Sequence, residues 1–213
     1  MKTKSKYKFV NYLWDTKKAE KLGDDQVSLF LYRSNLLGQD LRITNYGGGN
    51  TSCKTIEKDP ITNQDVEVMW IKGSGGDIGS LKRDGIAGLY NQRLHDLKKV
   101  YRGLEYEDDM VALFNHCIYD LDSRAPSIDT PLHGLLPFKH IDHLHPDALI
   151  AIAAAEASEE ITKEISFPAN LEIEENSLSG NANFTINRTE YGVLHNAKNF
   201  YKIAKDRIIS DDI

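Results

Sequence analysis

Three short runs rich in β-forming residues follow one another between residues 40 and 73, and turn signals separate them. The runs are "DLRIT" (40–44), "TSCKTIE" (51–57) and "DVEVMWIKG" (65–73). The loop "NYGGGN" lies between the first two runs, and the turn "KDPITNQ" lies between the last two. Glycine, proline, asparagine and aspartate are typical of the turns that separate strands. The sequence therefore predicts a strand meander broken by glycine loops.

Segments with helical spacing of apolar residues stand on both sides of this meander. Two helices are expected over 11–22 and 24–39, where Asp24 or Asp25 can cap the second helix and Gly38 can end it. Further along, "FKHIDHLH" reads as a strand that runs into a helix beginning at Pro146. The remaining predictions are helices over 85–104, 108–121 and 197–208, a strand over 191–195, and a polar segment without regular structure over 166–190.

Length and composition favour one α/β or α+β domain over residues 1–213. Of the 213 residues, 40% are hydrophobic and 27% are charged, which is enough for one core of roughly 150 to 200 residues. The formal net charge of -6 argues against general binding to a nucleic-acid backbone, so any phosphate must be bound locally.

Two further features bear on the compartment. Neither a signal-peptide-like run nor a stretch of membrane-spanning length is found, so we expect a cytoplasmic protein that binds no membrane. Cys53 and Cys117 are widely spaced, which suits a reducing compartment and argues against a disulfide framework or a cysteine zinc site.

A pair of histidines stands near the end of the expected strand, in "HLH". Alternate side chains of a strand share a face, so His143 and His145 would point the same way and could chelate one cation, such as Zn²⁺. The alternative is two ordinary histidines near a strand end. His140 falls on the opposite face by the same alternation, and we expect it to be a surface histidine or a neighbour of the site.

Upstream, "PSIDTPLHGLLP" places Asp129 and His133 four residues apart, on one face if the segment is helical. Spacing alone favours a capping role for Ser127 or Asp129. The functional alternative is a carboxylate that acts as a general base beside a metal ion.

Two glycine-rich loops also stand at expected strand ends, in "GGGNTS" (47–52) and "KGSGGDIGSL" (72–81). Glycine permits positive φ and lets backbone N–H groups approach an anion, while Asn, Ser and Thr add side-chain donors. The loops could cradle a phosphate, or they could be ordinary hairpin turns. Neither matches the dinucleotide-binding or P-loop pattern.

Taken in order, "LRITNYGGGNTSCK", "WIKGSGGDIG", "PSIDTPLH" and "HIDHLHPDALIA" resemble the class II aldolase/adducin family. More closely, they are similar to the aldolase half of bifunctional rhamnulose-1-phosphate aldolase/short-chain dehydrogenase proteins. The resemblance covers about residues 10–165 and leaves 166–213 as a divergent or truncated end. It implies a three-layer α/β/α fold with a central, mostly antiparallel sheet, and a homo-oligomer, a tetramer in the family.

The resemblance implies cleavage of a ketose phosphate, such as rhamnulose or fuculose 1-phosphate, to dihydroxyacetone phosphate and an aldehyde. Zinc or another divalent metal would act as a Lewis acid on the substrate. The roles carried over are zinc ligation for His143 and His145, phosphate binding for Asn50, Ser74, Gly75 and Ser127, and proton transfer for Asp129. The family usually has glutamate at the last position, so Asp129 is one methylene shorter.

A third zinc ligand is not fixed by the motifs, because the family's "NHG" element is missing after His145. His195 is the candidate, and Glu156, Glu159 or water could replace it. No dehydrogenase half follows in the sequence, so hydride transfer would need a separate partner chain. Two other functions remain open: a non-catalytic assembly module like adducin head domains, and a pentulose-5-phosphate epimerase.

Overall fold

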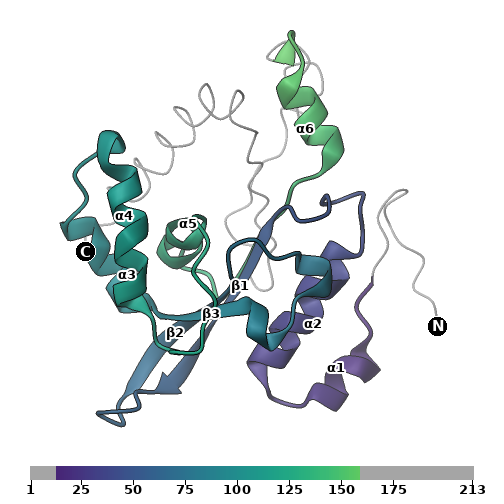
Figure 1. Ribbon diagram of the computed structural model, residues 1–213. Coiled ribbons are helices and arrows are strands. Elements are labelled where there is room, and N and C mark those ends of the chain that lie inside the picture. The colour runs from purple at the N-terminus through teal and green to yellow at the C-terminus, as the bar shows by residue number, and fades with distance from the viewer. Residues whose placement is uncertain (1–12, 159–213) are drawn as a thin grey trace, which may run out of the picture. The chain divides into compact units, whose positions relative to one another are not determined.

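The computed structural model describes residues 13–158 of the chain (Figure 1). The chain divides into two compact units between Leu144 and His145. The described part of the first unit holds a four-stranded sheet and the helices α1 to α5, and the described part of the second holds α6 (Asp147–Ala154). Pro146 takes the N-cap position of α6, so this helix begins one residue later than predicted.

All strand pairs of the sheet are antiparallel, and the strand order is β3-β2-β1-β4. The strands are β1 (Asn50–Lys58), β2 (Asp65–Lys72), β3 (Ile86–Tyr90) and β4 (His140–His143). The β1–β2 hairpin pairs Ser52 with Ile71, and on the other side of β1 Asn50 pairs with His143. The start of β1 and the end of β4 therefore meet at one end of the sheet.

The described part of the first unit contains five α-helices, of which α2, α3 and α5 pack against the sheet. The five are α1 (Thr16–Leu22), α2 (Gln26–Gly38), α3 (Asn91–Asp96), α4 (Glu107–Leu113) and α5 (Thr130–Leu135), with 3-10 turns at Ile78–Ser80, Arg83–Gly85, Leu97–Lys99, Leu104–Tyr106 and Phe114–Cys117. The Asp25 carboxylate accepts the N–H groups of Val27 and Ser28 at 3.0 and 3.1 Å, and α2 ends at Gly38. Both predicted ends of this helix are confirmed.

The apolar run in β2 explains why helices cover both faces of the sheet. Successive side chains of a strand point to opposite faces. Val68 and Trp70 pack with Phe30 of α2 in one core cluster, and Met69 and Ile71 pack in a second cluster that includes Leu94 of α3. Figure 1 shows α2 on one side of the sheet and α3 with α5 on the other. The predicted three-layer arrangement is confirmed.

Strand β1 is buried although its first half is mostly polar. Residues 50–55, "NTSCKT", are all buried. Buried polar groups need hydrogen-bond partners, and these side chains find them on other elements: Thr51 with the Ser34 hydroxyl at 2.7 Å, and Thr55 with the Trp70 indole N–H at 2.9 Å. The polar strand is therefore held by its neighbours through specific hydrogen bonds.

Two predicted elements are wrong. Residues 40–44 form turns, because the Asp40 carboxylate accepts both the backbone N–H of Arg42 and its guanidinium, and the Asp40 carbonyl accepts the N–H of Thr44. Residues 86–90 form β3 rather than helix, since they pair with β2. Of the helix predicted over 85–104, only α3 and the 3-10 turn that follows it are confirmed.

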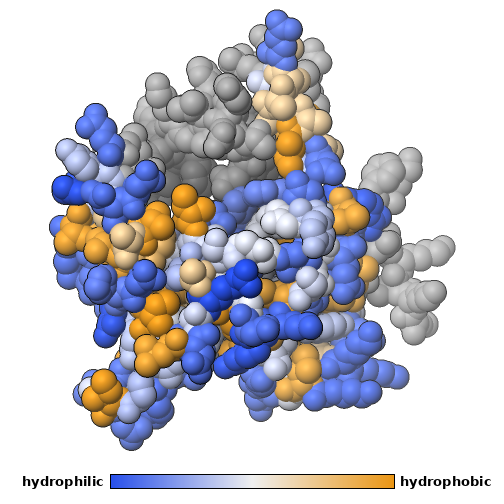
Figure 2. All heavy atoms as spheres, viewed as in Figure 1, coloured by the Kyte–Doolittle hydropathy of each residue, from blue (hydrophilic) through white to orange (hydrophobic). Residues whose placement is uncertain are grey.

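The face of the described residues that is seen in Figure 2 is mostly polar, with apolar side chains in scattered patches. The most exposed large apolar side chains, Tyr46, Ile61 and Leu121, lie on turns. Within residues 13–158, no helix has the length and hydropathy that a membrane crossing requires. The elements predicted over 166–208 lie outside the described residues.

Candidate functional site

The Asp129 carboxylate lies at the end of the sheet where β1 meets β4. One of its oxygens accepts hydrogen bonds from the Asn50 amide at 3.2 Å and from the Ser127 hydroxyl at 3.1 Å. Its other oxygen lies 3.7 Å from Nδ1 of His143. The side chains of His143 and Asp129 are 14% and 27% exposed. Three segments distant in sequence therefore bring an amide, a hydroxyl, a carboxylate and an imidazole together.

Asp129 occupies the N-cap position of α5 without capping it through its side chain. The backbone N–H of Asp129 donates to the Ser127 hydroxyl at 3.3 Å, and the Thr130 hydroxyl donates to the Ser127 carbonyl at 2.6 Å. The turn that precedes the helix is thus organised by Ser127, which leaves the Asp129 carboxylate to face Asn50 and His143. The capping role that spacing favoured for Asp129 is wrong.

The first glycine loop passes directly against β4. A Cβ placed on Gly49 would lie 2.6 Å from the carbonyl oxygen of His143, and Gly49 has a φ of 76°. The backbone N–H of Gly47 donates to the Asp77 carboxylate at 3.0 Å, which ties this loop to the second glycine loop. The two glycine loops predicted from the sequence are therefore neighbours.

The second glycine loop is held from within by Lys72. Its ammonium donates to the carbonyls of Gly76 and Gly73 at 2.8 and 3.4 Å, and the residue is 5% exposed. Burial lowers the pKa of Lys72, and the charge of Asp129 opposes that shift. Ser74 and Gly75 at the tip of the loop are exposed. The loop thus exposes its tip to solvent and encloses the buried ammonium of Lys72. No role was assigned to Lys72 from the sequence, although it directly precedes the first glycine of the loop.

A buried hydrogen bond from the same face of β1 as Asn50 supports the site. The Ser52 hydroxyl and Nδ1 of His133 are 2.7 Å apart, and both residues are fully buried. Nε2 of His133 is buried and has no hydrogen-bond partner among the described residues. Burial lowers the pKa of His133 to about 3, so its imidazole is neutral near pH 7. The α5 helix that carries Asp129 is therefore anchored to β1 by an uncharged pair.

The histidines that the sequence analysis proposed for the metal site are only partly described by the structure. His140 is exposed on β4 and alternates with His143, as predicted. Strand β4 ends at His143, and His145 belongs to the second unit, so the shared face of the pair stays a prediction. His195 and Glu159 lie outside the described residues. Among residues 13–158, no group of three or more His, Cys, Asp and Glu side chains is placed to hold a metal ion.

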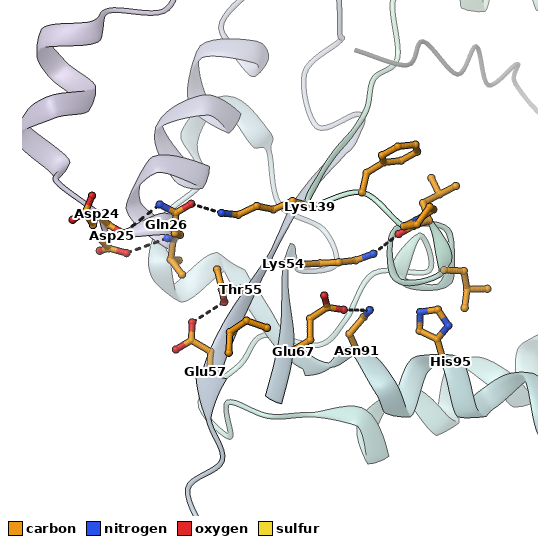
Figure 3. A pocket seen from close by; sticks show the side chains of 16 residues that line it. Asp24, Asp25, Gln26, Lys54, Thr55, Glu57, Glu67, Asn91, His95 and Lys139 are labelled. Atoms are coloured by element: carbon orange, nitrogen blue, oxygen red, sulfur yellow. Dashed lines mark hydrogen bonds between the residues drawn. The ribbon is translucent and has the colours of Figure 1, made fainter. Parts of the chain in front are cut away.

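A groove of about 860 Å³ lies elsewhere in the first unit (Figure 3). Its polar side chains include Lys54, Glu67, Asn91 and His95, and residues 135–138 supply an apolar wall. Lys54 donates to the carbonyl of Gly134 at 3.2 Å. None of the sequence-predicted site residues is among those that line this groove. The groove is therefore separate from the Asp129 site.

Comparisons with known proteins agree with the fold and the motifs. The profile of the family described as "Class II Aldolase and Adducin N-terminal domain" matches residues 31–192. A protein of Bacillus subtilis (strain 168), named "Uncharacterized oxidoreductase YuxG", is 42% identical over 157 residues. That match covers 73% of this chain and 22% of the relative, so the chain spans about a fifth of that protein's length.

A solved structure gives the same result. The N-terminal class II aldolase domain of a conserved protein from Thermoplasma acidophilum has a TM-score of 0.57 and 30% sequence identity. The superposition covers 66% of this chain and 64% of that one. The resemblance inferred from the four motifs is confirmed, and the chain belongs to the class II aldolase/adducin family.

Proposed function

We propose that this domain cleaves a phosphorylated ketose, such as rhamnulose or fuculose 1-phosphate, to dihydroxyacetone phosphate and an aldehyde. The observation that carries this proposal is the Asp129 carboxylate, which two hydrogen bonds hold 3.7 Å from the imidazole of His143. A partly buried carboxylate beside an imidazole at a sheet end is suited to proton transfer next to a bound cation. Family membership supports the reaction class.

The donor set fits a divalent metal in part. Imidazole and carboxylate are both zinc ligands, and the Oδ1 atom of the fully buried Asn50 has no hydrogen-bond partner among the described residues. We propose zinc ligation by His143 and His145, with His195 as the third ligand. When bound, the ion would supply a Lewis acid for the ketose carbonyl and hydroxyl oxygens.

The residues of the chain have separable tasks in this proposal. Asp129 accepts the proton of the substrate hydroxyl as the carbon–carbon bond breaks. Asn50 and Ser127 both donate to the same Asp129 oxygen, which fixes the orientation of the carboxylate and leaves its other oxygen toward His143. Such preorganisation removes the need to reorient the base during the reaction. The shorter reach of aspartate is then compensated by its fixed position.

Phosphate binding is assigned to the glycine loops. Asn50 also donates to the carbonyl of Lys72 at 3.4 Å, so the proposed base and the second glycine loop share a neighbour. Ser74 and Gly75 form the exposed tip of that loop, and Ser127 precedes Asp129. We assign the substrate phosphate to these residues.

The proposal is tested by incubating the purified full chain with Zn²⁺ and each sugar phosphate, and by measuring dihydroxyacetone phosphate with a coupled enzyme. We expect product from the wild type and none from a variant that combines His143→Ala with His145→Ala. Metal content is measured in parallel, because the same variant should lose stoichiometric zinc. A wild-type protein without product over background contradicts the aldolase proposal, and a metal-free protein that folds normally supports the non-catalytic alternative.

Partners and location are part of the same proposal. The Bacillus subtilis relative is named an oxidoreductase, and this chain matches 22% of it. We propose that the aldolase product is passed to a dehydrogenase, that the protein is a cytoplasmic homo-oligomer, and that its partners otherwise are small phosphorylated sugars. A pentulose 5-phosphate is included in the assay as a further substrate, since epimerised product would identify the epimerase alternative.

A further inference from the structure

Arg124 lies across the second glycine loop. A Cβ placed on Gly73 would lie 2.8 to 2.9 Å from Cβ, Cγ and Cδ of Arg124. Gly73 and Pro126 form an isolated antiparallel bridge, and the backbone N–H of Ser74 donates to the carbonyl of Ala125 at 2.9 Å. Because Gly73 has no side chain, the aliphatic part of Arg124 can lie flat against the loop.

The guanidinium of Arg124 is fixed over the exposed tip of the loop. Its Nε donates to the carbonyl of Ser74 at 2.8 Å, and Nη2 lies 3.8 Å from the position that a Cβ of Gly75 would take. Arg124 is exposed. Among the residues that the structure describes, the guanidinium makes this one hydrogen bond and no ion pair. Its remaining N–H groups are available to a ligand.

A second cation stands behind the same loop. Burial is the main cause of the lowered pKa of Lys72, the charges of Asp129 and Asp77 oppose it, and the charge of Arg124 adds a smaller contribution in the lowering direction. Two like charges near one short turn repel each other, and a bound anion reduces that repulsion. Lys72 is buried and donates to carbonyls of the loop, so the exposed Arg124 is the cation that a ligand at the tip can reach.

We propose that Arg124 binds the phosphate of the substrate at the tip formed by Ser74 and Gly75. This inference rests on the proposed function and adds a residue that the motifs do not assign. A guanidinium presents a planar fork of donors that matches phosphate oxygens, and such charge-assisted pairs are stronger than neutral hydrogen bonds. The Nε bond to Ser74 holds the fork in place, so binding requires little reorganisation.

The test is calorimetric titration of the full chain with inorganic phosphate and with dihydroxyacetone phosphate. Loss of a charge-assisted contact should weaken binding of both by about 10- to 100-fold in Arg124→Ala. Arg93→Ala is the matched control, because Arg93 is also exposed and donates one hydrogen bond to a backbone carbonyl, that of His116 at 2.9 Å. It removes the same charge far from the glycine loops in sequence and should bind phosphate as the wild type does.

Two more variants separate phosphate binding from a structural role in the loop. Arg124→Lys keeps the charge and should recover part of the affinity, whereas Arg124→Gln keeps an N–H donor for the Ser74 carbonyl and should stay weak. The proposal is overturned if Arg124→Ala binds phosphate like the wild type, if Arg124→Gln restores binding, or if the wild type binds neither anion. Phosphate binding that depends on Arg124 in a protein without aldolase turnover would reject the proposed reaction and keep this site.

Discussion

The side-chain amide of Asn50 donates a hydrogen bond to the Asp129 carboxylate at 3.2 Å, across a separation of 79 positions in the chain. The amide belongs to the first residue of β1, and the carboxylate belongs to the residue that precedes α5. This bond therefore connects the sheet to the segment that carries the proposed base. Its strength determines how firmly that base is positioned.

We expect Asn50→Ala to lower both stability and turnover. Removing one partner leaves buried polar groups unsatisfied, which costs about 1–3 kcal/mol in the free energy of unfolding. Urea denaturation measures that loss, and the exposed Asn115→Ala should change stability by less than about 0.5 kcal/mol. Equal midpoints for the two variants would show that the Asn50–Asp129 bond contributes nothing measurable.

Asp129→Asn should abolish proton transfer while keeping the fold. The asparagine has nearly the same shape, and its carbonyl oxygen can still accept from Asn50 or Ser127. Loss of a general base lowers turnover by about 10²- to 10⁴-fold, with KM changed much less, in the dihydroxyacetone phosphate assay. The exposed Asp122→Asn serves as the charge-matched control. Wild-type turnover in Asp129→Asn would exclude a role for this carboxylate in moving protons.

The sequence predicted the hairpin and α2 well because local signals determined them. The turn at 58–64 and the apolar run of β2 specify the β1–β2 pair, and Asp25 with Gly38 marks the ends of α2. It failed at 86–90, where apolar residues fit a strand and a helix equally well. Pairing with β2, which is a long-range contact, decided that segment in favour of β3.

The site was predictable in its residue types but not in its arrangement. The motifs named Asn50, Ser127 and Asp129, yet the capping preference of aspartate pointed to the wrong role for the last of these. Arg124 could not be found from spacing, because its position over the glycine loop depends on the bridge between Gly73 and Pro126. The bridge and the hydrogen bond from Arg124 to Ser74 join segments about 50 positions apart, and such long-range contacts leave no pattern in the local sequence.

Two glycines of the first loop provide a matched test of the close approach to β4. Gly47 and Gly49 have similar φ values of 74° and 76°, so alanine at either position is strained to about the same extent, roughly 1–2 kcal/mol. A Cβ at Gly47 meets no atom within 4 Å, whereas a Cβ at Gly49 would lie 2.6 Å from the carbonyl oxygen of His143. Gly49→Ala should therefore be clearly less stable than Gly47→Ala.

Urea denaturation of the two alanine variants measures this difference. The free energy of unfolding should be lower for Gly49→Ala by about 1–3 kcal/mol, the usual cost of forcing extra volume into a packed contact. Because the contact is with the backbone of β4, metal binding at His143 should weaken in the same variant and stay unchanged in Gly47→Ala. Identical stabilities would mean that the loop does not press against β4 in solution.

The buried His133 makes stability depend on pH in the acidic range. Burial holds its pKa at about 3 in the folded protein, while the unfolded chain has the ordinary value of about 6.5. Between these values the unfolded state binds more protons, so stability falls as pH falls from about 6.5 toward 3 and gains nothing from this group above pH 7. The slope attributable to one such histidine approaches about 1.4 kcal/mol per pH unit.

Urea denaturation at several pH values, compared between the wild type and two variants, isolates that slope. His133→Gln cannot take up the proton, so its stability should decline less steeply between pH 6 and pH 4, whereas the exposed His116→Gln should follow the wild type. If His133→Gln does not fold, the ring signals of His133 in NMR spectra of the wild type provide the same information. A wild-type ring that titrates near pH 6.5 in the folded state would contradict the buried, neutral pairing with Ser52 and would remove the anchor inferred for α5.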